Sequence, residues 1–358
     1  MNITKTYTAM KTLTKTLIVI PLLLGLTMTS CIRKTDVEIP DSEKRLDHLV
    51  ILEVFYTGSF NKTGERKTKD GRIEELGYAD ERNKYLKIYN PTEEVKYLDG
   101  LALATSLFTS TAQVEFTDEA QNFTDTHMAV DRITYFPGSG TEFPIKPGEV
   151  KLITAWAGDY TKPVLDSDGD EIGAANIDSF DFTKADFQWL SEEELSYDID
   201  REDYPANRAV PSMKLTYPAD SRRTFNISHN QTIALIKFDK NELSEPKIKE
   251  HMKEYTLKFF TTNEWTVDYT SLVIPNDIII DAVTVAPTEQ FTSKPVGEKV
   301  DAGAFGVTNV HSTAARRDLL GLAMRRKHDG NKYVDDNNST SDFEVVKAGL
   351  QTPDPLKP

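Results

Sequence analysis

The chain has 358 residues, a formal net charge of −15 at pH 7 and a single cysteine, which excludes an internal disulfide. The acidic balance argues against nucleic acid as a partner, because binding to phosphates depends on Lys and Arg. A hydrophobic content of 39% is enough to build a core, so global disorder is excluded.

The first residues have the pattern of a secretory signal. Lysines precede an apolar run at residues 17–26, and no acidic residue occurs before Asp36. The run is roughly half the length that crosses a bilayer, so it predicts a cleaved segment and not a permanent span. Residues 28–31, Met-Thr-Ser-Cys, resemble the lipobox of bacterial lipoproteins, in which the cysteine is acylated and becomes the mature N-terminus. We therefore expect a signal peptide at residues 1–30 and lipidation at Cys31. The alternative is an ordinary secretory signal with a leftover thiol.

Residues 31–45 contain charged residues and Pro40 and have little to bury, which predicts a flexible tether. Acidic residues soon after the lipidated cysteine resemble the surface-export signals of Bacteroidetes lipoproteins. The resemblance implies a lipid-anchored protein of the outer membrane that is exposed at the cell surface.

From residue 49 the pattern becomes that of strands. Residues 49–56 are too apolar on both faces for an amphipathic helix and predict a buried strand. Residues 61–83 are charged and lack apolar periodicity, which predicts a long surface loop. Residues 183–195 are the one helix candidate. Further strands are expected at residues 85–89, 101–107, 130–136, 150–156, 232–238, 256–260, 278–285 and 323–327. Without strand-helix alternation, an antiparallel sandwich fits best.

Several short segments resemble successive signatures of lamin-tail-like domains. They are the strand that carries Glu53, Asn90-Pro91, Leu98-Asp99-Gly100-Leu101, Pro147-Gly148-Glu149, and the closing segment from Asp335 to Phe343. The resemblance implies an all-β fold: an immunoglobulin-like (lamin-tail-like) antiparallel β-sandwich with long loop insertions. We expect it to occupy residues 46–350 as one domain, followed by a C-terminal tail at residues 351–358.

A narrower resemblance covers nearly the whole mature chain. Its landmarks are Asp-Phe-Thr-Lys-Ala-Asp-Phe-Gln-Trp at residues 181–189, Val210-Pro211, Asp301-Ala302-Gly303 and Met-Arg-Arg-Lys at residues 324–327. These are similar to landmarks of an uncharacterised family (domain of unknown function) of Bacteroidetes outer-membrane lipoproteins. Many members carry an extra N-terminal β-module, for which the tether here is too short. The resemblance supplies no activity and no catalytic residue.

One acidic loop, residues 166–171, alternates carboxylates as calcium loops do. Its glycine is at the fourth place and its twelfth place is Ile177, whereas an EF-hand needs glycine at the sixth place and glutamate at the twelfth. We therefore expect an Asp/Gly hairpin turn between two strands. The alternative is a calcium site formed by Asp166, Asp168 and Asp170.

The remaining charged clusters predict surface positions. The acidic cluster of Asp198, Asp200, Glu202 and Asp203 favours a solvated loop over a site for a cation or a basic partner. The six histidines are scattered, and no second histidine joins His251 and Glu254 to complete a zinc site. Besides Arg316-Arg317, the basic residues cluster at 325–327. On a strand, Arg325 and Lys327 would share one face and Arg326 would point to the other.

No Gly-x-Ser-x-Gly, phosphate loop or dinucleotide fingerprint occurs. We therefore predict no catalytic residue, no cofactor and no metal ligand, and a non-enzymatic cell-surface lipoprotein that is a binding or accessory module. Loops at residues 61–83, 158–176 and 197–211 are expected to carry recognition. The expected partners are the membrane, through the N-terminal lipid, and an outer-membrane, TonB-dependent nutrient transporter, but not nucleic acid. The alternatives are a structural or adhesive component such as a fimbrial subunit and, with less support, a secreted hydrolase.

Overall fold

The computed structural model describes residues 46–80, 83–165, 168–173, 175–176, 178–190, 207–219, 225–237, 245–260, 264–287, 290–307, 320–330 and 332–351. The signal peptide, Cys31, the tether, the acidic cluster at 198–203 and Arg316-Arg317 lie outside these ranges. The described residues belong to one compact unit, Arg45–Pro358.

The predicted all-β fold is confirmed, and β1, the strand expected at residues 49–56, lies inside a six-stranded sheet. The order of this sheet is β13-β10-β4-β1-β19-β22, and its pairs are antiparallel except for the parallel pair of β10 and β13. Its strands are β1 (Val50–Phe55), β4 (Tyr85–Tyr89), β10 (Val150–Thr154), β13 (Phe187–Gln188), β19 (Leu322–Arg326) and β22 (Phe343–Lys347).

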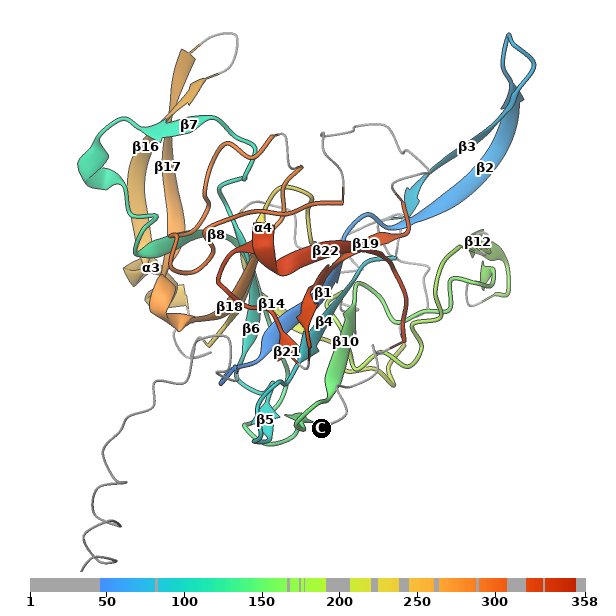
Figure 1. The fold of residues 1–358 in the computed structure, drawn as a ribbon, viewed down its shortest axis with the longest axis horizontal. Coiled ribbons are helices and arrows are strands. Elements are labelled where there is room, and N and C mark those ends of the chain that lie inside the picture. The colour runs from blue at the N-terminus through green and yellow to red at the C-terminus, as the bar shows by residue number, and fades with distance from the viewer. Residues whose placement is uncertain are drawn as a thin grey trace, which may run out of the picture. The chain divides into compact units, whose positions relative to one another are not determined.

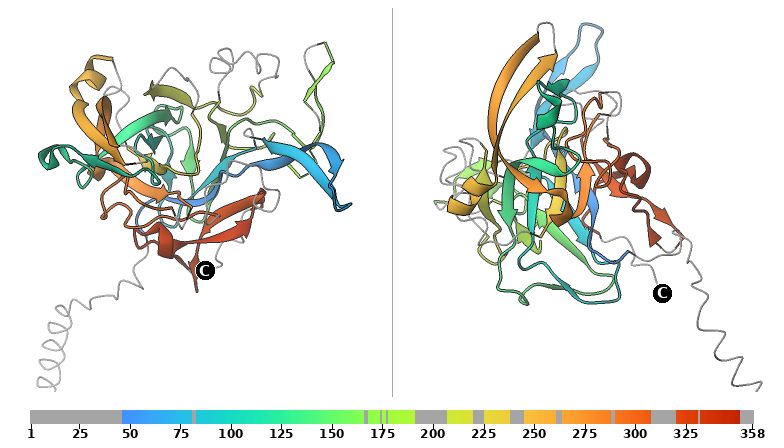
Figure 2. Two further views of the ribbon diagram at one scale, coloured as in Figure 1. Left: turned by 90° about the horizontal axis from the view of Figure 1, so that it is seen from above. Right: turned by 90° about the vertical axis from the view of Figure 1, so that its left-hand side faces the viewer.

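A second, antiparallel sheet faces the first (Figures 1 and 2). Its order is β18-β15-β6-β8-β17-β16-β7, and β14 also pairs with β8. Its strands are β6 (Ala102–Ser106), β7 (Val114–Phe116), β8 (His127–Tyr135), β14 (Lys214–Pro218), β15 (Thr232–Ile236), β16 (Met252–Phe260), β17 (Glu264–Pro275) and β18 (Ile279–Thr284).

Small ribbons and short helices complete the described chain. The two-stranded ribbons are β2 (Ser59–Lys67) with β3 (Ile73–Asp80), β5 (Lys96–Tyr97) with β9 (Pro144–Ile145), β11 (Val164–Leu165) with β12 (Glu171–Gly173), and β20 (His328–Asp329) with β21 (Lys332–Tyr333). The helices are η2 (Glu119–Gln121), α3 (Glu245–Glu250), η4 (Asn276–Ile278) and α4 (Ser339–Asp342). Within the described ranges, no helix is long and apolar enough to cross a membrane.

The main core lies between the two sheets. Side chains such as Ile51 and Leu86 from one sheet pack in the same cluster as Leu103 and Ile233 from the other. Because successive side chains of a strand point to opposite faces, the neighbouring residues of β6 and β15, such as Ala104, join a second cluster on the far face. The central strands are thus buried on both sides, which explains their continuous apolar sequences.

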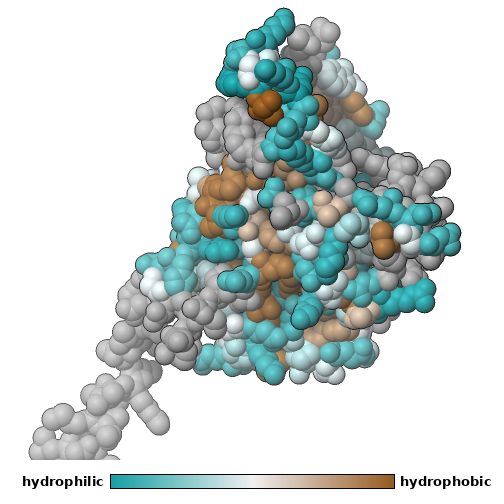
Figure 3. Space-filling model, turned by 90° about the vertical axis from the view of Figure 1, so that its right-hand side faces the viewer, coloured by the Kyte–Doolittle hydropathy of each residue, from teal (hydrophilic) through white to brown (hydrophobic). Residues whose placement is uncertain are grey.

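The predicted loop at residues 61–83 is wrong, because β2 and β3 form a hairpin that projects from the sandwich (Figure 1). Cross-strand ion pairs join Lys62 Nζ to Glu75 at 2.9 Å and Arg66 Nε to Glu74 at 2.7 Å. An exposed ribbon stabilised by opposite charges needs no apolar alternation, so the usual sign of a strand is absent. Figure 3 views the molecule from the right-hand side of Figure 1, and the upper end that projects there is mainly hydrophilic.

The helix expected at residues 183–195 is also wrong over its described part. Residues 187–188 form β13, in which Phe187 lies opposite Ile153 of β10. Phe187 and Trp189 are both buried, and between them Gln188 Nε2 donates hydrogen bonds to the backbone oxygens of neighbouring loops. Packing of aromatic residues against the sheet outweighs the helix propensity of the charged residues around them.

Candidate functional site

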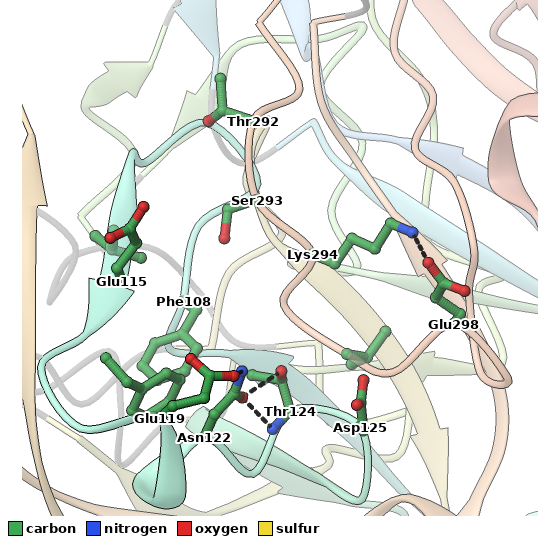
Figure 4. Close-up of a pocket in the computed structure, with 13 residues that line it drawn as sticks. Phe108, Glu115, Glu119, Asn122, Thr124, Asp125, Thr292, Ser293, Lys294 and Glu298 are labelled. Carbon is green, nitrogen blue, oxygen red and sulfur yellow. Dashed lines mark hydrogen bonds and ion pairs between the residues drawn. The ribbon is translucent and has the colours of Figure 1, made fainter.

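A cavity of about 320 Å³ lies between β7, η2 and the segment 292–298 (Figure 4). We call it the β7 pocket. Its apolar lining consists of Phe108, Val114, Phe116 and Val296. Its polar lining consists of Glu115, Glu119, Asn122, Thr124, Asp125, Thr292, Ser293, Lys294 and Glu298. Cavities of this volume fall at the lower end of the range for small-molecule sites.

Two local turns hold the lower wall of the β7 pocket. The side chain of Asp118 accepts a hydrogen bond from Ala120 N at 3.0 Å and thereby caps η2. Asn122 Oδ1 accepts hydrogen bonds from Thr124 N at 3.1 Å and Thr124 Oγ1 at 2.9 Å, as Figure 4 shows. Such Asx turns fix a short loop through its own side chains, so this wall is formed in the absence of a ligand.

The floor of the pocket is aromatic. The ring centroids of Phe108 and Phe116 are 6.0 Å apart with planes at 72°, and both rings also contact Phe123 and Tyr255. Edge-to-face pairs of this kind match the positive edge of one ring to the negative face of the next. These four side chains belong to an aromatic cluster separate from the main core.

The same sheet face continues from the pocket to an exposed tryptophan. Val114 of β7 lies opposite Phe259 of β16, which in turn lies opposite Trp265 of β17. The rings of Phe259 and Trp265 are stacked, with centroids 5.5 Å apart and planes at 4°. Trp265 is 45% exposed, whereas the other two tryptophans, Trp156 and Trp189, are buried.

Carboxylates dominate the electrostatics of the β7 pocket. Four of them, from Glu115, Glu119, Asp125 and Glu298, line the cavity together with one lysine, Lys294. Lys294 Nζ donates to the Glu298 carboxylate four residues later, so its charge is already balanced. These carboxylates lie at exposed positions around the cavity, and together they favour a positive ligand over a negative one.

A second group of charges is buried around Arg326 and joins the two sheets. Its Nη2 donates to both carboxylate oxygens of Asp281, on β18, at 2.9 and 2.8 Å. Its Nη1 pairs with Asp335 at 3.0 Å and with Asp342 at 3.5 Å. His48 Nε2 lies 3.0 Å from the other oxygen of Asp335, and this hydrogen bond raises the pKa of His48 to about 9. Burial would raise the pKa of Asp335, but the hydrogen bond from His48 and the charge of Arg326 lower it.

A third group of charges surrounds Glu53 on the opposite face of β19. Lys87 Nζ donates to Glu53 Oε1 at 3.2 Å and to the backbone oxygen of Gly349 at 2.6 Å. Arg325 Nε and the hydroxyl of Tyr85 also donate to the Glu53 carboxylate. Burial lowers the pKa of Lys87 and, with the charge of Glu53, raises that of Tyr85. This group fastens residues near the C-terminus to the sheet.

The expected opposite orientation of Arg325 and Arg326 is confirmed. The two side chains contact different buried carboxylates, Glu53 and Asp281. Lys327 Nζ donates to Ser341 O at 2.6 Å at an exposed position, so these three residues do not form one basic patch.

The acidic loop at residues 166–171 connects β11 and β12, which pair antiparallel, so the expected hairpin is confirmed. Asp166 and Ile177 lie outside the described residues. No group of three His, Cys, Asp or Glu side chains that could hold a metal ion occurs among the residues that the structure describes. His48 belongs to the Arg326 group and His251 lies at the start of β16, while His311 is not described.

The sequence alone does not reveal the β7 pocket or the Arg326 group. The pocket combines residues 108–125 with residues 292–298, and no local pattern links segments that far apart. A usable signal existed for β17, where Trp265, Val267 and Tyr269 alternate with polar residues as a half-exposed strand requires.

Comparisons with known proteins agree with the fold. A solved crystal structure of a DUF4876 family protein from Bacteroides thetaiotaomicron VPI-5482 superposes with a TM-score of 0.59 and 23% identity, over 87% of this chain and 75% of that chain. No curated protein matches. A family model described as a protein of unknown function (DUF4876) matches residues 146–349, more than half of the chain. The expected uncharacterised Bacteroidetes family is thus confirmed: this chain belongs to the DUF4876 family.

Proposed function

We propose that this chain is a non-catalytic binding module, anchored to the outer membrane by lipid on Cys31 and exposed at the cell surface. The lipobox-like residues 28–31 support the anchor. The observation that carries the binding role is the β7 pocket, whose walls and aromatic floor are fixed by the protein's own contacts. Preformed concave sites on a rigid scaffold are the usual place for ligand recognition.

The positions of strongly shifted titratable groups support a non-catalytic role. The raised pKa of His48 and the lowered pKa of Lys87 arise where each side chain contacts buried groups of the protein itself. Perturbed groups indicate catalysis when they open into a cleft, whereas ion pairs within a core perturb pKa values for structural reasons.

We also propose a role beside a TonB-dependent nutrient transporter. In the six-stranded sheet, β1 is paired on both sides with strands of the same chain, β4 and β19. A module that completes this part of its sandwich by itself fits a monomeric accessory protein better than a fimbrial subunit that needs a donated strand.

The test is purification of the native lipoprotein from outer membranes, with a Cys31→Ala variant as control. We expect the wild-type protein to incorporate a fatty-acid analogue and to co-purify with an outer-membrane barrel. The Cys31→Ala variant should lose the label and leave the outer-membrane fraction. A Cys31→Ala variant that keeps the label and stays in the outer-membrane fraction would refute the lipid anchor. Recovery of the wild-type protein as a polymer would favour the adhesive alternative.

A further inference from the structure

We infer that the β7 pocket binds an organic cation, that is, a small molecule with an ammonium or guanidinium group on an apolar body. This inference rests on the proposed binding function and names the ligand class. It combines three observations: uncompensated carboxylates, an aromatic floor, and neutral polar groups that are already hydrogen-bonded.

The first observation is the state of the carboxylates. Lys294 is the single basic side chain in the lining, and its ammonium group is paired with the Glu298 carboxylate. Within the part of the chain that the structure describes, the carboxylates of Glu115 and Asp125 form no hydrogen bond or ion pair with another side chain. They lie on different walls, Glu115 on β7 and Asp125 after η2, and Figure 4 shows the cavity between them. These two carboxylates are the charges available to balance a bound cation.

The second observation is that the aromatic cluster already attracts an ammonium group. Lys253 Nζ, which belongs to β16, lies 4.6 Å from the ring centroid of Phe123. Phe108 and Phe116, which contact that ring, line the cavity themselves. The negative face of an aromatic ring stabilises a cation within about 6 Å, and cages of such rings recognise quaternary ammonium groups.

The third observation concerns the neutral polar side chains of the lining. Asn122 Oδ1 is occupied by two hydrogen bonds from Thr124, and Thr292 Oγ1 donates to Ala112 O at 3.1 Å. The groups left for a ligand are mainly carboxylates, which accept hydrogen bonds and donate none. A saccharide hydroxyl can donate to a carboxylate, so the preference for a cation rests on the negative charge of the lining and on its aromatic rings. An anion would be repelled.

The volume limits the size of the occupant. About 320 Å³ suits a small molecule, so a folded partner is excluded as the occupant of the cavity itself. Trp265 lies two strands across from Val114, on the same face, at roughly 10 Å by ordinary strand spacing. Because it is the exposed tryptophan, its fluorescence reports on this face.

The experiment compares choline with 3,3-dimethylbutan-1-ol, which has the same shape but no charge. Binding to the full-length lipoprotein in detergent is followed by calorimetry and by tryptophan fluorescence. We expect choline to bind about tenfold more tightly than the neutral alcohol, and its affinity to fall as salt is raised. The double variant Glu115→Gln/Asp125→Asn should lose about tenfold in choline affinity with an unchanged melting temperature. Glu344→Gln, which removes an exposed carboxylate on β22, is the matched control and should bind as the wild type does.

Three results would overturn the inference. They are equal binding of choline and the neutral alcohol, choline binding that the double variant does not change, and binding of cellobiose without binding of choline. None of these bears on the lipid label or on co-purification with a barrel, so a failure here is distinguishable from a failure of the proposed function.

Discussion

Replacement of Arg326 by methionine should reveal how much the buried ion group contributes to stability. The side chain is 1% exposed, and the carboxylates of Asp281, Asp335 and Asp342 around it are 2–3% exposed. Methionine keeps much of the volume but leaves these carboxylates without their guanidinium. Breaking a buried ion pair by removing one partner costs about 3–5 kcal/mol, which is a large part of a typical stability of about 5–15 kcal/mol.

The loss should be measured as the free energy of unfolding in urea, followed by circular dichroism. Lys327→Met is the matched control. Lys327 follows Arg326 directly, and its ammonium group donates a hydrogen bond at an exposed position. Its side chain should therefore contribute less than about 1 kcal/mol to the free energy of unfolding. Arg326→Met/Asp281→Asn should recover part of the loss, since it removes one of the buried charges left unpaired. A cost below about 1 kcal/mol for Arg326→Met alone would refute the view that this group holds the two sheets together.

Three further predictions concern His48, the β11–β12 loop and Cys31. The pKa of His48 is raised to about 9 in the folded state. The stability that its protonated ring contributes should therefore be complete below about pH 6.5 and lost as pH rises through 9. Unfolding curves at pH 6 and pH 9.5 should show this difference in the free energy of unfolding, and His48→Gln should abolish it. The shift corresponds to at most about 3 kcal/mol, and solvent at the partly exposed ring should reduce it. The melting temperature should not respond to millimolar calcium or chelator. A bound ion would add about 2.7 kcal/mol to the free energy of unfolding at a hundredfold excess over Kd. A calcium-dependent rise in melting temperature that disappears in Asp168→Ala would make the β11–β12 loop a metal site. Cys31→Ala should abolish labelling by a fatty-acid analogue, and a labelled variant would contradict the lipobox.

The parts of the fold that could be predicted from the sequence are the strands buried on both faces. Residues 49–56 and 232–238 contain continuous apolar, β-branched runs because β1 and β15 have a core on each side. Most of the β2–β3 hairpin could not be predicted in this way, since β2 is largely exposed beyond its first three residues and carries charged cross-strand pairs. Local sequence therefore reports burial more directly than it reports strand pairing.

The candidate site was beyond prediction for a different reason. Neither Glu115 nor Asp125 stands out in its own segment, and their relation to residues 292–298 exists only after β7 and β16 have paired. Arg326 likewise resembles one of several exposed basic residues until three carboxylates from distant segments surround it. A site assembled from distant segments produces no periodic pattern in the sequence.

The position of β1 constrains how the chain can fold. One edge of β1 pairs with β4, which follows it closely, but the other pairs with β19, and the contact of Glu53 with Arg325 spans 272 residues. Synthesis must nearly finish before that edge is covered, so the sandwich cannot assemble progressively from its N-terminus. Such long-range pairing slows folding and leaves the apolar strand exposed to wrong partners in the meantime. Removal of β19 and β22 should therefore abolish cooperative folding of the whole sandwich and not merely shorten it.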